Sequence, residues 1–290
     1  MNLSDLLNSN LPFITYGSFK PGELRYNLIK EHVENFEKII IKGLMEEKDG
    51  IPIFRKYKEG SMQCHYEAYT INFKSGHFQI AYEKIIQSEE NTFYNWDTLE
   101  NKNILIGKPN LKGTIPFLQE VWTFQKDPYF KSGIDTAEKI FRLKEGEHSI
   151  KDEFFEFFKT SSSYMLLWTI IERFCTLKYG TLTQVSQKIK SLAEDPEIDW
   201  DKILSKISRT DSIYRSDRIN DILVLDKNKS AKKNLDYYYG IRSNMVHRGK
   251  DAFVDSIRIS DAFIELKMIF ETILEEHNYF NNTKSKQIGN

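Results

Sequence analysis

The chain has 290 residues, 40% of them hydrophobic and 13% aromatic, which is enough for two domains with cores of their own. Its formal net charge of −1 excludes a globally basic nucleic-acid binder, so any such affinity must come from a local patch. Its two cysteines, Cys64 and Cys175, lack CxxC spacing, which excludes a disulfide framework and a cysteine zinc site.

Residues 11–125 have the pattern of strands and turns. Residues 13–16 are β-rich and stop at Gly17, residues 38–42 run into a glycine, and residues 66–73 alternate before a Ser-Gly turn. Residues 77–88 interrupt this pattern with apolar side chains at helical spacing, and we expect one helix there.

From about Ile134 onward the pattern is almost entirely helical. Turn residues cluster between Asp127 and Gly133, so we place a domain boundary there, giving domains 1–130 and 131–290. The expected helices cover residues 162–179, ending at Gly180, and then 183–193, 231–247 and 256–277.

No apolar stretch of about 18 residues predicts a membrane span, and the first residues lack the pattern of a secretory leader. We therefore expect a cytoplasmic protein without membrane partners.

The helix over 231–247 carries the most informative motif, with Arg242 five residues before His247. Its apolar residues predict a core helix, and Gly249 predicts its end. His247 then lies in the last turn, where the helix dipole favours the protonated ring. On one ideal helix the two side chains are about 140° apart. A shared site therefore requires the helix to loosen near Gly249, or a second copy of the chain to face it.

Arg and His together suit the cleavage of RNA. A histidine that titrates near neutrality can move the proton of a ribose 2′-hydroxyl, and a guanidinium can bind the scissile phosphate. Asn244 offers one more polar contact, and no carboxylate cluster nearby predicts a metal or another cofactor. Seven basic residues against one acid predict a phosphate-facing patch: Lys227, Lys229, Lys232, Lys233, Arg242, Arg248 and Lys250, against Asp236. Such a spacing also arises by chance, and a lone helical histidine is usually structural, so a non-catalytic helix stays open.

The string Ile-Arg-Ser-Asn-Met-Val-His-Arg-Gly-Lys at 241–250 resembles the HEPN superfamily, in the branch of abortive-infection and phage-defence proteins. The resemblance covers about residues 135–280 and includes residues 166–174, a helix expected to pack against the motif helix. It implies an all-α bundle, a homodimer with a shared cleft, and RNA cleavage through a 2′,3′-cyclic phosphate. Arg242 and His247 match its motif, with Asn244 as a third catalytic candidate; Ser243, Arg248 and Lys250 are substrate-binding candidates. Whether Ser243 or Asn244 contributes the polar contact after the arginine stays open.

In the first half, residues 13–22 predict a strand followed by a tight loop with Gly17 and Gly22. Such a loop can direct backbone N–H groups at an anion, or it can be a simple turn. The segment Tyr16-Gly17-Ser18-Phe19 resembles the loop of the gamma-glutamylcyclotransferase-like fold, with Phe19 in place of the usual leucine. The match continues through Arg25-Tyr26-Asn27, residues 41–44 and 49–52, the strand 67–71 and the following helix.

That resemblance implies a small mixed β-barrel flanked by helices, with a pocket at Tyr16, Gly17, Ser18 and a glutamate after the helix. Glu89 is the first candidate for this acid/base, with Glu90 and Glu83 as alternatives, although the glycine that usually follows it is absent. Ligand sensing or a purely structural role stays open beside cyclotransferase activity.

Two other groups of residues carry weaker signals. Cys64, His65 and His77 offer no fixed set of metal ligands. Tyr214, Arg215 and Arg218 form an arginine–aromatic cluster that suits contact with RNA and suits a surface loop equally well.

The sequence thus predicts an α+β multidomain protein, a cyclotransferase-like barrel followed by an all-α HEPN bundle. Its expected function is that of a metal-independent endoribonuclease of toxin or antiviral type, with RNA as substrate, a homodimer as its assembly, and a regulatory or antitoxin partner. The alternatives are a gamma-glutamylcyclotransferase-type enzyme and a non-catalytic module that binds RNA or a nucleotide.

Overall fold

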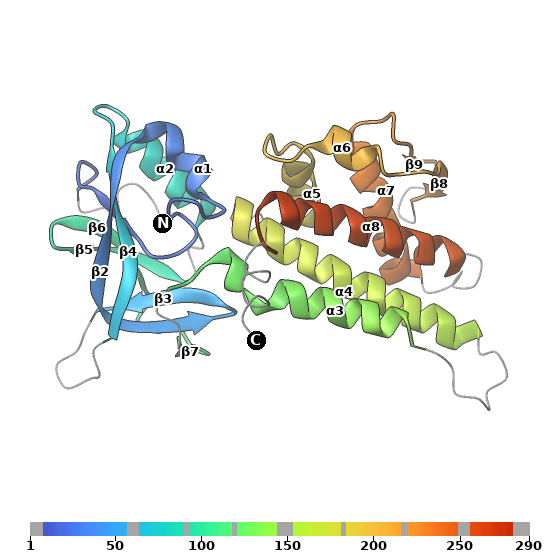
Figure 1. The fold of residues 1–290 in the computed structure, drawn as a ribbon, viewed down its shortest axis with the longest axis horizontal. Coiled ribbons are helices and arrows are strands. Elements are labelled where there is room, and N and C mark those ends of the chain that lie inside the picture. Colours follow the sequence, from blue (N-terminus) through green and yellow to red (C-terminus); the bar gives the residue numbers. More distant parts are fainter. Residues whose placement is uncertain are drawn as a thin grey trace, which may run out of the picture. The chain divides into compact units, whose positions relative to one another are not determined.

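The computed structural model describes residues 8–56, 64–89, 93–117, 121–143, 153–180, 184–215, 220–248 and 256–280, with all of their side chains except those at 153, 154, 247, 248 and 256. Helices and strands are mixed in one α+β chain (Figure 1). The chain forms two compact units. The first comprises Met1–Asp127 with Thr176–Thr181, and the second comprises Pro128–Cys175 with Leu182–Asn290.

The first unit is built on one mixed sheet, in the strand order β3-β2-β4-β1-β6-β5, with β7 paired to β2. Strands β1 and β6 are parallel, and the other pairs are antiparallel. The strands are β1 (Phe13–Thr15), β2 (Val33–Lys48), β3 (Ile51–Arg55), β4 (Cys64–Phe73), β5 (Tyr94–Leu99), β6 (Lys102–Gly107) and β7 (Ile115–Pro116). The expected barrel is wrong as a closed structure, because no ladder within the described residues joins β3 to β5.

Two hairpins of this sheet turn on pairs of residues with positive φ. Asp49 (φ 53°) and Gly50 (φ 74°) connect β2 to β3, and Glu100 (φ 50°) and Asn101 (φ 58°) connect β5 to β6. Two central residues with positive φ are typical of the type I′ turn, whose twist matches that of the flanking strands. The turns therefore set the register of both hairpins.

Helix α2 (Phe78–Ser88) packs on the sheet, as the helical spacing predicts. Its Tyr82 ring makes edge contacts with Phe13 of β1 and Phe73 of β4. Ile85, one turn later, is fully buried. Burial of these large side chains places the core between α2 and the sheet. Three short elements complete the unit: α1 (Tyr26–Ile29), η2 (Lys30–His32) and η3 (Phe124–Lys126).

The second unit is mostly helical. Its helices are α3 (Pro128–Phe141), α4 (Glu153–Tyr179), α5 (Val185–Ala193), α6 (Trp200–Leu204), α7 (Ala231–Arg248) and α8 (Ser256–Glu276). Of these, α4, α5, α7 and α8 overlap the expected helices, whereas α3 begins within the segment that was expected to be a turn. Helix α4 begins nine residues before the expected residue 162. It runs through the serines at 161–163, and the Ser163 hydroxyl donates to the Lys159 carbonyl at 2.9 Å within the helix. It ends at Gly180 (φ 80°), as predicted.

Two sequence interpretations are wrong in this unit. The bundle is not all-α, because β8 (Asp211–Tyr214) and β9 (Ile222–Leu225) form an antiparallel hairpin. Gly133 is not a turn residue, since it lies within α3, where a Cβ would come within 2.6 Å of the Ile170 side chain. This glycine therefore serves the close packing of α3 against α4.

A hydrogen-bonded network attaches β8 to α7 and α8. The Asp211 carboxylate accepts from Tyr237 at 2.5 Å, from Arg209 at 2.8 Å and from Arg258 at 2.9 Å. The Glu265 carboxylate accepts from Arg209 and from Tyr238. Burial alone would raise the pKa of Asp211, but the hydrogen bonds from Tyr237, Ser212 and Arg258 outweigh it and hold the pKa below its ordinary value.

Across the part of the chain that the structure describes, no helix is both long enough and apolar enough to cross a lipid bilayer.

Candidate functional site

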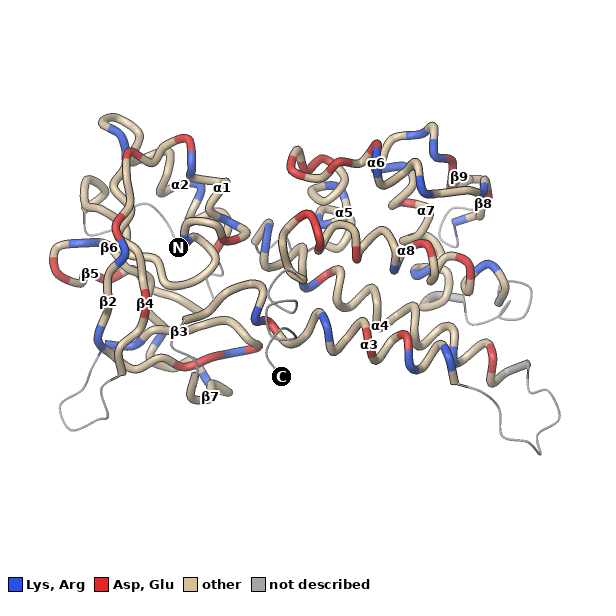
Figure 2. Tube along the Cα trace, viewed as in Figure 1, with Lys and Arg blue, Asp and Glu red and all other residues tan. Residues whose placement is uncertain are grey.

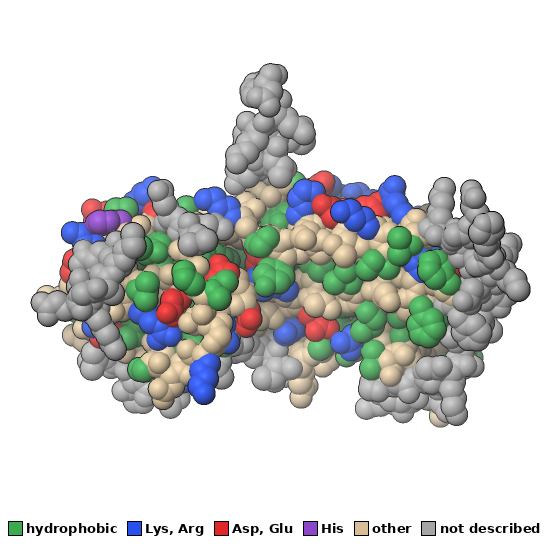
Figure 3. Space-filling model, turned by 90° about the horizontal axis from the view of Figure 1, so that it is seen from below, with side chains coloured by type: hydrophobic (Ala, Val, Ile, Leu, Met, Phe, Trp, Pro, Cys, Tyr) green, Lys and Arg blue, Asp and Glu red, His purple; other side chains and the backbone are tan. Residues whose placement is uncertain are grey.

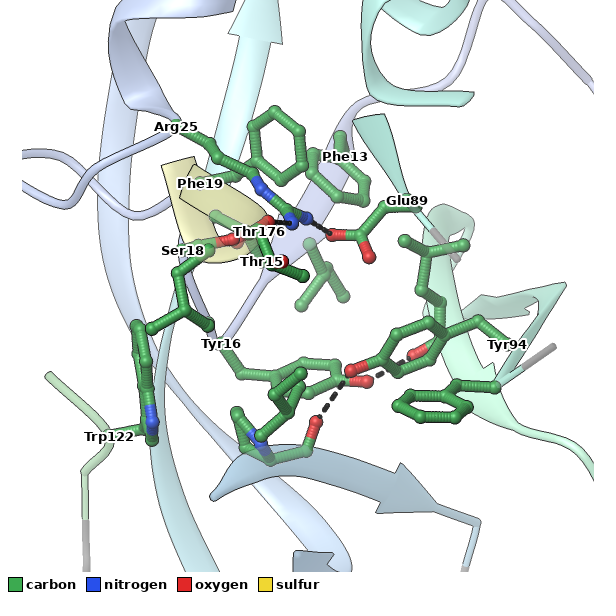
Figure 4. Close-up of a pocket in the computed structure, with 17 residues that line it drawn as sticks. Phe13, Thr15, Tyr16, Ser18, Phe19, Arg25, Glu89, Tyr94, Trp122 and Thr176 are labelled. Carbon is green, nitrogen blue, oxygen red and sulfur yellow. Dashed lines mark hydrogen bonds and ion pairs between the residues drawn. The ribbon is translucent and has the colours of Figure 1, made fainter. Parts of the chain in front are cut away.

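The first unit contains a pocket beside the loop that follows β1 (Figure 4). It holds about 630 Å³ of non-atom space, its open mouth included. Aromatic and aliphatic side chains form most of its wall, among them Phe13, Phe93 and Leu105. A mostly apolar wall with a few polar groups is typical of sites for small molecules.

All four residues predicted for this pocket line it: Tyr16, Gly17, Ser18 and Glu89. The Tyr16 hydroxyl donates to the Leu105 carbonyl at 2.7 Å and accepts from the Phe54 N–H at 3.3 Å. Burial raises the pKa of Tyr16, so this phenol stays neutral and structural.

The loop itself is closed by backbone hydrogen bonds. The Gly17 carbonyl accepts from Lys20 N–H at 3.1 Å, and the Ser18 carbonyl accepts from Arg25 N–H at 2.9 Å. Gly22 has φ 86° and nothing near an added Cβ, so it serves as a turn former.

Glu89 follows α2 directly and pairs with Arg25 at 3.1 Å, and both side chains are nearly buried. Figure 4 shows this pair at one end of the pocket and the Tyr16 and Tyr94 hydroxyls toward the other. The Arg25 guanidinium also donates to the Thr176 carbonyl at 2.8 Å, while its Nε is enclosed without an acceptor. The alternative Glu83 does not line this pocket, and Glu90 lies outside the described residues.

Among the other lining residues, Arg25, Tyr94 and Trp122 were not predicted as parts of the pocket. Arg25 was visible as part of the resemblance, but its pairing with Glu89 requires the fold. Two more charged side chains of the same loop region, Lys20 and Glu23, are also buried. Burial lowers the pKa of Lys20 and raises the pKa of Glu23, whose carboxylate accepts from the Phe124 N–H.

In the second unit, α7 presents Arg242 to α4, as the expected packing of the two helices requires. The guanidinium lies 3.3 Å from the Glu172 carboxylate and 5.5 Å from the centre of the Tyr239 ring. Its side chain is 22% exposed, although its Nε is enclosed without an acceptor. Arg242 is therefore held in place while part of its surface stays accessible.

Two more contacts fix α7 on α4. The Tyr164 hydroxyl donates to the Tyr238 carbonyl at 2.7 Å, and Trp168 packs edge-on against Tyr239. Tyr164, Trp168 and Glu172 follow one another at intervals of four residues, so one stripe of α4 supports the motif. Glu172 was not predicted as a site residue; its place four residues after Trp168 was the available signal.

Ser243 and Asn244 line a different hollow, next to α5, which Arg242 does not line. The Asn244 amide donates to the Tyr214 carbonyl at 2.8 Å. The predicted grouping of Arg242 with Asn244 is therefore not observed, since each side chain faces a different neighbour.

The remaining motif side chains, His247, Arg248 and Lys250, lie outside the described side chains. The backbone of α7 stays helical through Arg248. Positions 242 and 247 are therefore about 140° apart around the axis of an ideal helix.

The predicted basic patch is divided between surfaces. Lys227 and Lys229 border one hollow with Trp200, whereas Lys232 borders the hollow of Ser243 and Asn244. Lys227, Lys229 and Lys232 therefore do not border one shared hollow.

One group among the described residues has the spacing of metal ligands. Asp195, Glu197 and His277 offer atoms that all lie within 4.8 Å of one another. It shares no residue with the pocket or with the motif. Cys64 and His65 begin β4, while His77 lies beside His32, with their Nδ1 atoms 3.0 Å apart, so the sequence group with Cys64 does not assemble.

Comparisons with protein-family models, with curated proteins and with solved structures each return no match.

Proposed function

We propose that this chain is a metal-independent endoribonuclease of toxin or antiviral-defence type, whose second unit is a HEPN-like domain. The observation that carries the proposal is the state of Arg242. Its guanidinium is positioned by Glu172 and Tyr239 on a helix of the core, and it remains 22% exposed. A positioned and accessible guanidinium suits an oxyanion that develops during the reaction.

In the proposed reaction a ribose 2′-oxygen attacks the adjacent phosphorus and the 5′-oxygen leaves. His247 takes the 2′ proton while water protonates the leaving 5′-oxygen, or water takes the 2′ proton while His247 protonates the leaving oxygen; its ordinary pKa near neutrality suits either role. Arg242 binds the non-bridging oxygens as their charge rises. The products are a 2′,3′-cyclic phosphate and a 5′-hydroxyl. Ser243, Asn244, Arg248 and Lys250 contribute to substrate binding.

A homodimer solves the angular problem of the motif. Because the backbone of α7 stays helical through Arg248, positions 242 and 247 of one copy are about 140° apart around the helix axis. A two-fold axis beside α7 would place the arginine of one copy near the histidine of the other.

Exposed apolar side chains occur on several helices of the second unit, with Val246 on α7 itself. Figure 3 shows hydrophobic side chains gathered on one face of the helical unit. Burial of apolar surface is the main driving force of association. Large exposed side chains occur on α3, α4, α7 and α8: Tyr129, Phe158, Val246, Ile257 and Ile264.

The proposal is tested by incubating the purified protein with total RNA in EDTA, beside Arg242→Ala and His247→Ala. We expect cleavage in EDTA, ends that carry 2′,3′-cyclic phosphate, and loss of about 10²–10³-fold of the rate in each variant. Arg142→Ala is the matched control, because Arg142 is an exposed arginine of α3 paired with Glu138. Undiminished cutting by His247→Ala would defeat the proposal.

The first unit supports a second candidate function, that of a gamma-glutamylcyclotransferase-like domain that acts on or senses a small molecule. The specific observation is the Glu89 carboxylate at the end of an apolar pocket, beside the loop at Tyr16, Gly17 and Ser18. In this proposal the unit regulates the ribonuclease in the cytoplasm, alone or with an antitoxin partner.

Measuring the release of 5-oxoproline from gamma-glutamyl donors distinguishes an enzymatic role of this pocket from a sensing role. Turnover that is lost in Glu89→Gln would establish an enzyme, and binding without turnover would establish a sensor. RNA affinity without any cleavage would instead leave a non-catalytic RNA-binding module.

A further inference from the structure

A second hollow lies on the helical unit between α5 and α7, with β9 at its base. It holds about 920 Å³ of non-atom space, its mouth included. Two polar positions of α5, Ser186 and Gln187, border one side, and Ser243 and Asn244 of α7 border the other. We refer to it as the α5–α7 groove.

The charge of this groove is positive. Three cations border it, Lys190, Arg215 and Lys232, against one acid, Asp236. Asp236 is bound to Lys232 at 2.7 Å, so this pair cancels within α7 and the net positive charge of the groove comes from Lys190 and Arg215. Figure 2 shows that Lys and Arg occur on α5, on α7 and near the hairpin. Cations on separate walls attract a polyanion that runs between them.

The groove adjoins the proposed catalytic arginine. Tyr239 lines it, and the same ring lies 5.5 Å below the Arg242 guanidinium. Ser243, which follows Arg242 in the chain, also lines it. A strand held in the groove therefore passes next to the group that is proposed to bind the scissile phosphate.

The hairpin that forms the base of the groove is held firmly against α7. Gly240 makes this possible, because a Cβ there would come within 2.4 Å of the Leu223 side chain. The Asn244 amide binds the Tyr214 carbonyl, and the Arg215 N–H donates to the Asp221 carbonyl at 3.1 Å. These contacts bring Arg215 to the groove from an element distant in sequence from Lys190.

The geometry points to the α5–α7 groove as the binding site for a single strand of RNA on its way to Arg242, an inference that rests on the proposed function. Phosphates contact Lys190 and Arg215, while sugars and bases contact the serine, glutamine and asparagine side chains. A paired duplex keeps its bases stacked inside and presents a wide, rigid surface, whereas a single strand can lay a base on the Tyr239 ring.

Fluorescence anisotropy with a labelled 20-nucleotide RNA tests this inference, in a His247→Ala background that prevents cleavage. The double variant Lys190→Glu/Arg215→Glu reverses charge on two walls. We expect it to weaken binding of the single strand by about tenfold or more and to flatten the dependence of affinity on salt. The double variant Lys139→Glu/Lys233→Glu is the matched control, because it reverses two charges on exposed lysines of the helical unit that do not border the groove. It should change affinity less than about twofold.

Equal losses in the double variant and in the control would overturn the inference, as would tighter binding of an RNA duplex than of the single strand. Circular dichroism of both variants, expected to match the parent, shows that the comparison concerns folded protein. Cleavage separates the two proposals. If a cleavage-competent Lys190→Glu/Arg215→Glu variant cut RNA normally, the groove proposal would be wrong and the ribonuclease proposal would stand. If the unmutated chain bound RNA through the groove but did not cut it, the ribonuclease proposal would be wrong and the groove proposal would stand.

Discussion

Each unit of the molecule contains one arginine–glutamate pair at its candidate site, and the two pairs differ in exposure. In the first unit, Arg25 and Glu89 are 7% and 12% exposed and lie 3.1 Å apart. In the second, Arg242 and Glu172 are 22% and 25% exposed and lie 3.3 Å apart. Removing one partner of a buried pair leaves an uncompensated charge, whereas a more open pair contributes little to stability. The same chemistry thus supports the fold in one unit and leaves a guanidinium available in the other.

The largest effect that tests this comparison is expected for Arg25→Met. The substitution leaves the Glu89 carboxylate buried without its partner, so local stability should fall by about 3–5 kcal/mol. Amide hydrogen exchange of β1 and α2 in the full chain measures this loss. Arg242→Met removes a more exposed partner, so the exchange of α7 should change by less than that of β1 and α2 in Arg25→Met.

The matched control in the first unit is Lys56→Met, which breaks the more exposed pair with Asp97. It should cost no more than about 1 kcal/mol. Comparable losses for Arg25→Met and Lys56→Met would show that burial does not distinguish these pairs.

A smaller effect is expected for Tyr237→Phe in the network around Asp211. It removes a 2.5 Å hydrogen bond to a charged carboxylate, which should cost about 1.5–3 kcal/mol of the stability of the second unit. The network also predicts a pH dependence. Because the folded pKa of Asp211 is lowered, its contribution is present above the unfolded value of about 3.9 and is lost as the pH falls below it.

Urea unfolding between pH 3 and 6, monitored by the hydrogen exchange of β8, measures both the cost of Tyr237→Phe and the loss of stability in acid. Asp211→Asn should remove the part of the stability loss at low pH that comes from protonation of Asp211. An unchanged acid transition in Asp211→Asn would show that other carboxylates carry it.

The smallest expected effect concerns the base of the α5–α7 groove. Gly240→Ala adds a methyl group within 2.4 Å of Leu223, which should cost about 1–3 kcal/mol through a shift of the hairpin. Leu223→Ala in the same chain opens room for the methyl group. Thermal unfolding should therefore show a smaller loss from Gly240→Ala in the Leu223→Ala chain than in the unmutated chain. Strictly additive losses would contradict the packing argument.

Much of the fold follows from local patterns in the sequence. The spacing of apolar residues predicts α2, α5, α7 and α8, and Gly180 predicts the end of α4. The β8–β9 hairpin was missed, because its two strands have four residues each and owe their stability to packing on α7. The open order of the sheet also depends on pairing between distant strands, which no local pattern specifies.

The candidate sites divide in the same way. Loop residues near one another in sequence, Tyr16, Gly17 and Ser18, could be named without a structure, and the pocket does include them. Partners from distant elements could not be named: Arg25 for Glu89, and Glu172 for Arg242. Such pairs form only when the chain brings together residues far apart in sequence.

The central claim is that Arg242 of one copy and His247 of another act on the same phosphodiester. Coexpression of an Arg242→Ala chain and a His247→Ala chain with different affinity tags yields a heterodimer with one complete site. We expect this heterodimer to cut RNA at about half the unmutated rate, while each parental homodimer stays inactive. A purified heterodimer as inactive as its parents would contradict the claim.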